Sequence, residues 1–472
     1  MTGYLELFRH GRASLSLALL TAITLVALDV LIIGTVLPTL LEIFGGVHLY
    51  AWALGAYNLG NFITIPIFSV LTGKWGGRGA FSLALGIFLA GAVVGTTAKS
   101  MEWIVAARLL QGIGAGGFFA IPFALIARFY PSDLQPRAVG LVSSVWGISA
   151  LLGPVAGAAI LRYLGWHWVF AFNLPVGLCI WFLAMISLRG EGPPPQPKAE
   201  VNWVGPLLFA IWTALLLEAL GRVFPLNLAL LFWGALTFFV FWTYEKGKKT
   251  PTIPREVWSP KTSLGAAFLG MVLSAIAFGG AETYLPLLLQ GLYQKSPMEA
   301  GAILTVGSVG WSFTSFFIAR FAQTPRRIAI LGSILLSLGL LGLVAVIYAH
   351  GFLPGIYLFW FLSGIGMGMV VPTYNTRAMD LKSRYPEGVA TGSVLLGMTW
   401  GFSLGAPLAG VAAEWGFGEH FDPQGLSQGL LPALSEAALH RGGLFALLTC
   451  LIAIFFAGRV ARRLPVLREI LK

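Results

Sequence analysis

Charged side chains inside long apolar runs are the residues of this sequence best placed to do chemistry. Three acids, Asp29, Glu218 and Glu282, and one base, Arg108, lie well within stretches that are otherwise almost entirely apolar. If those stretches cross a membrane, each charge costs roughly 2.5–3.5 kcal/mol near the bilayer centre. Such a residue is therefore expected to pair with another group or to face a water-filled pathway, where a carboxylate can exchange protons.

Asp29 is the first candidate because it lies far from both ends of its run. We expect it to bind a proton or a cation, and Arg108 to control that proton. Arg108 lies one or two helical turns shallower, which at about 1.5 Å per residue is within reach of its side chain if the two helices are neighbours. The alternatives are a purely structural ion pair for Asp29 and hydrogen bonds to backbone carbonyls for Arg108.

Glu282 and Glu218 lie nearer to the ends of their runs. We expect Glu282 to face a central cavity, as a second protonation site or as an anchor for a cation. Glu218 falls in a helix pair that separates two larger groups of helices, so a direct role is less expected for it.

The composition indicates that these runs are membrane-spanning helices. Of 472 residues, 57% are hydrophobic and 10% are charged, whereas soluble chains carry about 25% charged residues. This balance excludes a soluble enzyme, a nucleic-acid-binding domain, a disordered chain and a disulfide-stapled secreted domain. One crossing needs about 20 apolar residues, and the long continuous runs predict an all-α integral membrane protein with 14 transmembrane helices. The predicted spans are 14–41, 51–72, 80–98, 103–128, 137–161, 167–188, 203–221, 226–244, 263–290, 298–320, 327–349, 352–376, 388–413 and 442–461.

The basic residues predict the orientation, because cytoplasmic loops are rich in Lys and Arg. With the N-terminus inside, the predicted inner segments contain 24 of the 30 Lys and Arg residues and the outer segments five. Both termini are then cytoplasmic, and the net charge of +11 follows from topology without a nucleic-acid partner.

Two polar, proline-rich stretches, 189–202 and 245–262, interrupt the hydrophobic rhythm. They predict an N-terminal six-helix bundle at 1–188, linkers with an inserted two-helix hairpin at 189–262, and a C-terminal six-helix bundle at 263–472. The long outer loop 414–441 has apolar residues at helical spacing. It is either a short amphipathic helix at the membrane surface or an ordered loop without a role in transport.

Four stretches match sequence motifs in the expected helices. They are Leu28-Asp29 with Leu37-Pro38, the segment from Arg108 to Gly116, the segment from Gly147 to Gly157, and the segment from Trp166 to Gly177. In these motifs the chain resembles the major facilitator superfamily, and within it the 14-helix drug:proton antiporter family. The resemblance implies a major facilitator fold of 6 + 2 + 6 helices and proton-coupled export by alternating access. It also implies conformational roles for Gly147, Gly153, Pro154 and Gly157.

The first cytoplasmic gating loop departs from the family pattern. The family carries an acidic residue there between a glycine and basic residues, whereas this chain has Gly73 at the acidic position and Ser69 at the first glycine. Lys74 and Arg78 remain as candidate gating residues and are expected to contact lipid phosphate or helix ends.

Aromatic and amide side chains are the candidates for the substrate cavity, where stacking and cation–π attraction would favour lipophilic cations. They are Tyr57, Asn58, Asn61, Trp146, Tyr284, Trp311, Tyr374 and Asn375. The expected function is a proton-coupled secondary transporter that exports lipophilic or cationic small molecules; the alternative is a lipid or glycolipid transporter on the same fold. The expected partners are an amphipathic small molecule or lipid, protons and membrane lipid.

Enzyme, ATP-driven pump and channel are weaker alternatives. The six histidines are scattered without a paired metal-ligand spacing, no Walker-type loop occurs, and no repeated filter-like loop is visible. We therefore expect no cofactor and no metal, and a monomeric multi-pass protein of the cell membrane, inner or plasma.

Overall fold

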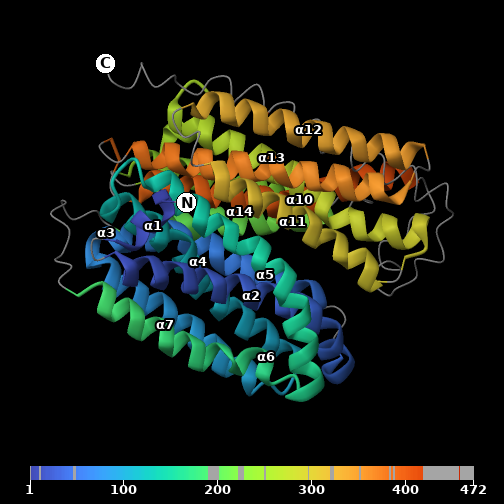
Figure 1. Ribbon diagram of the computed structural model, residues 1–472, viewed down its shortest axis with the longest axis horizontal. Coiled ribbons are helices and arrows are strands. Elements are labelled where there is room, and N and C mark those ends of the chain that lie inside the picture. The colour runs from blue at the N-terminus through green and yellow to red at the C-terminus, as the bar shows by residue number, and fades with distance from the viewer. Residues whose placement is uncertain are drawn as a thin grey trace.

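The computed structural model describes residues 2–9, 12–45, 49–189, 201–221, 228–248, 251–295, 297–318, 324–349, 352–381, 384–385, 388–417 and 457. Within these ranges every regular element is a helix (Figure 1). The short elements are α1 (Thr2–Leu5), η1 (Glu6–Phe8), α6 (Trp168–Ala171) and η3 (Arg255–Trp258). The long helices are α2 (Ala13–Phe44), α3 (Tyr50–Thr96), α4 (Met101–Phe129), α5 (Gln135–Tyr163), α7 (Asn173–Ser187), α8 (Val204–Gly221), α9 (Leu228–Lys246), α10 (Ser263–Tyr293), α11 (Pro297–Ile318), α12 (Pro325–Tyr348), α13 (Leu353–Asp380) and α14 (Val389–Phe417).

Nine of the helices in these ranges are long and apolar enough to cross a membrane, and ten if the bent α5 counts as one span. The all-helical membrane fold is thus confirmed. The count of 14 and the cytoplasmic termini stay predictions. All of the last predicted span, 442–461, except residue 457, and most of the outer loop 414–441 lie outside the described residues.

The helix α3 contains both predicted spans, 51–72 and 80–98, as two helical parts joined by a kink. It is broken at Gly76, which has φ 78° and ψ 166°. Only glycine adopts such a conformation without strain, so a single residue turns the chain where a loop is expected.

Two groups of helices form the body of the molecule. In Figure 1, α2 to α7 lie together in the lower half and α10 to α14 in the upper half, and the groups diverge toward the end that carries α6. The helix α5 packs against α2 in its own group and against α11 in the other. A central interface therefore separates the N-terminal and C-terminal parts of the chain.

The inserted hairpin of α8 and α9 packs on the outside of this body. Its helix α8 contacts α3 and α14, one helix from each group. Phe209 and Trp212 of α8 lie 5.5 and 5.3 Å from Trp400 of α14, measured between ring centroids. At the end of α9 the buried Glu245 carboxylate accepts hydrogen bonds from Asn202 and from the backbone N–H and hydroxyl of Thr252. The hairpin is thereby tied to the polar segments on both of its sides.

The two groups meet at one end of the interface, which we call the inner rim: Tyr4, Ser69, Gly140, Ser315, Phe316, Gly388 and Gly392. The Tyr4 ring stacks on the Phe316 ring at 4.3 Å, and its hydroxyl donates to the Phe316 carbonyl. Gly140 lies directly against the Ser315 carbonyl, and Gly388 and Gly392 lie against Ser69. The residue pattern predicts that this end is cytoplasmic, so the inner side is closed by small residues and one aromatic stack.

Candidate functional site

A cavity of about 330 Å³ lies between the two groups of helices. Its walls come from α2, α3, α4 and α5 on one side and from α10, α11, α13 and α14 on the other. Among the described residues its lining is mostly apolar and aromatic, and it contains one charged side chain, Glu282.

Six of the eight predicted substrate residues line this cavity: Tyr57, Asn58, Asn61, Trp146, Trp311 and Asn375. The Trp146 ring stacks on Phe119 at 5.8 Å, and the Trp311 ring stacks on Phe402 at 6.2 Å. Each half of the molecule therefore presents a tryptophan supported by a phenylalanine, which gives the cavity two rigid aromatic walls.

The other two, Tyr284 and Tyr374, do not line the cavity. Tyr284 lies two positions after Glu282, which at 3.6 residues per turn is about 200° around α10. Tyr374 directly precedes Asn375, so it lies about 100° away around α13. Its buried ring packs against Gly270 of α10. Both were predicted from residue type alone, and helix rotation directs them elsewhere.

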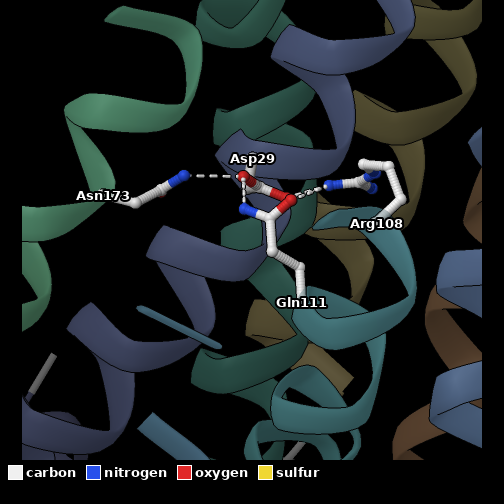
Figure 2. Close-up of polar contacts among 4 residues, drawn as sticks. All are labelled: Asp29, Arg108, Gln111 and Asn173. Atoms are coloured by element: carbon white, nitrogen blue, oxygen red, sulfur yellow. Dashed lines mark hydrogen bonds and ion pairs between the residues drawn. The ribbon is translucent and has the colours of Figure 1, made fainter. Parts of the chain in front are cut away.

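The structure brings Asp29 and Arg108 together in the interior of the N-terminal helices (Figure 2). The Arg108 Nη1 atom lies 2.6 Å from Asp29 Oδ2, and the two side chains are 1% and 0% exposed. The same Nη1 donates to Gln111 Oε1 at 2.9 Å. The expected partner for each buried charge is thus present, on a neighbouring helix.

Two amides complete this network, which we call the Asp29 cluster: Asp29, Arg108, Gln111 and Asn173. Gln111 Nε2 and Asn173 Nδ2 both donate to Asp29 Oδ1, at 2.9 and 2.8 Å (Figure 2). Three donors on two oxygens suit an ionised carboxylate, because a protonated acid would itself need to donate. All four members lie behind the cavity wall, where α2, α4 and α7 meet.

Sequence reasoning missed Gln111 and Asn173 as members of the site. Gln111 is three residues after Arg108 and hence on the same helix face. Asn173 lies in the motif from Trp166 to Gly177. A search for polar side chains on the Arg108 face would have found Gln111, whereas only the packing of α7 on α2 reveals Asn173.

Tyr57 lies between the Asp29 cluster and the cavity. Its ring lines the cavity and has the Arg108 guanidinium carbon 4.2 Å from its centroid. The Tyr57 backbone is in direct contact with Gly112 of α4, where a side chain would not fit. The close approach of α3 and α4 therefore fixes the position of this tyrosine.

Glu282 lies on the opposite side of the cavity, on α10. Within the described residues its carboxyl group forms no hydrogen bond or ion pair, in contrast to Asp29. A carboxylate in an apolar cavity without a fixed partner is available to a cation or a proton that enters the cavity.

The predicted conformational glycines lie at close contacts of α5. Gly153 packs against Leu31 and Gly157 against Ile32 and Thr35, all on α2. Gly147 faces α11, where its N–H donates to Ser312 Oγ at 2.7 Å. At the position of Pro154 the helix bends by 42° between Gln135–Gly153 and Val155–Tyr163, as expected where proline removes a backbone donor.

The basic gating candidates Lys74 and Arg78 are exposed near the break of α3. The Arg78 Nε donates to Met185 Sδ of α7 at 3.2 Å. The inner rim lies beside this segment, and its described contacts are made by other residues.

Comparisons with known proteins agree with this architecture. The family model described as Major Facilitator Superfamily matches residues 19–406 and 267–459. Multidrug resistance protein 3 of Bacillus subtilis is 27% identical over 410 residues, which cover 84% of this chain and 78% of that protein. The multidrug transporter protein MdtP of the same species is 25% identical over 423 residues, covering 86% and 77%. A crystal structure of the human organic anion transporter MFSD10 superposes with a TM-score of 0.69 at 16% identity, covering 95% of this chain and 99% of that one.

Proposed function

Because this chain belongs to the Major Facilitator Superfamily, we propose that it is a proton-coupled exporter of lipophilic cations that works by alternating access. It is a transporter and not an enzyme. Relatives named for multidrug resistance and multidrug transport, at 25–27% identity, support export of small amphipathic molecules.

The cavity carries the proposal for the substrate. Aromatic walls that include Trp146, Trp311 and Phe402 surround the one charged side chain of the described lining, Glu282. Aromatic faces attract cations, and more strongly where water is excluded, while a buried carboxylate without a partner is costly until a cation neutralises it. An apolar molecule with one positive charge satisfies both features.

The Asp29 cluster is the proposed proton site. A proton that binds the Asp29 carboxylate must compete with Arg108 for Oδ2, so protonation releases the guanidinium, and return of Arg108 expels the proton. A proton moving through 100 mV supplies about 2.3 kcal/mol. Because the cluster joins side chains of α2, α4 and α7, its protonation would change the contacts between these helices.

Alternating access needs the two groups of helices to rock about their interface. In the proposed orientation, the closed inner rim corresponds to the state in which the cavity faces outward. The contacts of Gly147, Gly153 and Gly157 let α5 lie close to both α2 and α11, which is how small residues allow helices to approach in lipid.

A lipid or glycolipid substrate is the alternative. Pockets for drug-sized ligands span about 300–1,000 Å³, and a cavity of about 330 Å³ is at the lower limit of that range. This size favours a compact cation over a lipid with two acyl chains.

The remaining proposals concern topology and location. We propose 14 transmembrane helices arranged as 6 + 2 + 6, both termini in the cytoplasm, and the division into 1–188, 189–262 and 263–472. We also propose a monomer in the cell membrane.

The test is efflux from proteoliposomes that contain the purified protein and ethidium, with an imposed pH gradient. We expect gradient-driven transport by the wild-type protein and by Glu42→Gln, a control on the exposed side of the same helix as Asp29. Asp29→Asn should abolish the response to the gradient, and Glu282→Gln should reduce transport of ethidium. Full gradient-driven efflux by Asp29→Asn would refute the proton site, and extraction of labelled lipid in place of ethidium would favour the alternative substrate.

A further inference from the structure

We propose that Tyr57 is a positioning residue that transmits the protonation of Asp29 to the substrate cavity, through the stacking of Arg108 on its ring. The proposal rests on the proposed function, since it assumes that Asp29 takes up the proton. It assigns Tyr57 a second role, in addition to lining the cavity.

Tyr57 contacts both the Asp29 cluster and the cavity. One side of its ring faces the Arg108 guanidinium at 4.2 Å from the ring centroid, and the ring also forms part of the cavity wall. The side chain is 4% exposed. A change in the position of Arg108 therefore reaches the cavity through one aromatic ring.

One nitrogen of Arg108 makes both of its described hydrogen bonds. Its Nη1 donates to both Asp29 and Gln111, whereas its Nε has no hydrogen-bond partner among the described residues. A proton on Asp29 removes the charge that holds Nη1. The guanidinium is then held at Nη1 by Gln111 alone. It can shift relative to the Tyr57 ring, which changes the attraction between cation and ring.

Few other groups around Asp29 could carry the effect of its protonation to the cavity. Arg108 of α4 and Tyr57 of α3 are the charged and titratable groups that face Asp29 among the described residues. The helix α7 contributes the neutral Asn173, and α5 contributes Gly153 against Leu31, two residues along. Glu282 faces the cavity from α10.

The Tyr57 side chain, rather than its backbone, is the part that can respond. The backbone is fixed by direct contact with Gly112. Its hydroxyl lies near Asn61 without a hydrogen bond of ordinary geometry. A ring without a firm polar anchor can turn when its cationic neighbour leaves, and this alters the cavity wall.

The test measures ethidium affinity of the purified protein by fluorescence between pH 5.5 and 8. Glu282 is a second carboxyl group in the cavity, so the quantity of interest is the part of the pH dependence that Asp29→Asn removes. We expect that part to be about tenfold, within the usual range of coupling between two sites. Tyr57→Leu should remove the same part of the pH dependence as Asp29→Asn. Tyr57→Phe keeps the ring and should therefore keep the wild-type pH dependence. Trp146→Leu, an aromatic change in the same cavity without an arginine contact, should weaken binding but keep the pH dependence.

The outcomes separate the two proposals. If Tyr57→Leu keeps the wild-type pH dependence, or if Tyr57→Phe loses it, the role of the ring is refuted while the proposed function stands. If Asp29→Asn keeps both the full pH dependence and gradient-driven efflux, the proposed function itself fails. Tyr57→Met, which keeps much of the side-chain volume without a ring, provides the same comparison if the leucine variant does not fold.

Discussion

Removing Asp29 and Arg108 together should destabilise the protein by less than the sum of the losses from removing each one alone. Asp29→Asn leaves the Arg108 charge buried without its counter-ion and turns an amide toward Gln111 and Asn173, which are both donors to this position. Arg108→Gln leaves the carboxylate with those two amide donors alone. In the double variant no charge is left buried in the cluster.

The magnitude follows from the burial and the distance. The two side chains are 0% and 1% exposed and 2.6 Å apart. Breaking a buried pair from one side costs about 3–5 kcal/mol, so each single variant should lose that much free energy of unfolding. The loss in the double variant should be smaller than the sum of the two by about 2 kcal/mol, within the usual range for residues in contact.

The assay is unfolding in mixed micelles by added dodecyl sulfate, followed by the fluorescence of the 16 tryptophans. The control is the same cycle on Lys295 and Glu299, an ion pair with a distance of 3.5 Å and side chains that are 32% and 51% exposed. Exposed pairs contribute about 0–1 kcal/mol, so this cycle should give a small coupling. Additive losses at Asp29 and Arg108 would refute the view that they form one energetic unit.

Three further predictions follow from the contacts described above. Gly147→Ala should push α5 away from Ser308 and Ser312 and reduce the initial rate of ethidium efflux about tenfold, equivalent to about 1.4 kcal/mol; Gly34→Ala, at a site with open space around it, should keep the wild-type rate. Trp146→Ala should weaken equilibrium binding of ethidium by roughly thirtyfold, because a desolvated cation–π contact contributes about 2 kcal/mol; unchanged affinity would remove this wall from the binding site. Glu245→Ala should lower the free energy of unfolding by about 1–3 kcal/mol, because the Thr252 N–H and hydroxyl lose their acceptor; Glu256→Ala, exposed in the same linker, should change it by less than about 0.5 kcal/mol.

Most of the helices could be predicted from sequence because lipid imposes a length and a composition on each crossing. The helix α4 is predicted at 103–128 and observed at Met101–Phe129. The predicted spans 51–72 and 80–98 are the two parts of α3, and the kink at Gly76 between them replaces the longer loop that the polar stretch from Lys74 to Arg78 indicates. The count of crossings depends on the segment after α14, which hydropathy alone predicts.

The candidate site was predictable where it depends on charge and less so where it depends on rotation. A lone Asp and a lone Arg inside lipid must find partners, so their pairing follows from energetics. Neutral amides such as Gln111 and Asn173 carry no comparable penalty and are not distinguished by it. The direction of Tyr284 and Tyr374 depends on the rotation of α10 and α13, which near-uniform apolar helices do not encode in any obvious pattern.

The closure of the inner rim by small residues has a consequence for how the transporter can be driven. Where the family has an acidic residue, this chain has Gly73, and the described contacts of the rim are van der Waals packing, backbone proximity, the Tyr4–Phe316 stack and the hydrogen bond from the Tyr4 hydroxyl to the Phe316 carbonyl. Packing of this kind depends on shape and scarcely varies with ionic strength, unlike a charge pair at a surface. We therefore expect these contacts to vary little with salt at the predicted cytoplasmic end, and the proposed proton switch at Asp29 then lies deep among the helices rather than at the mouth of the protein.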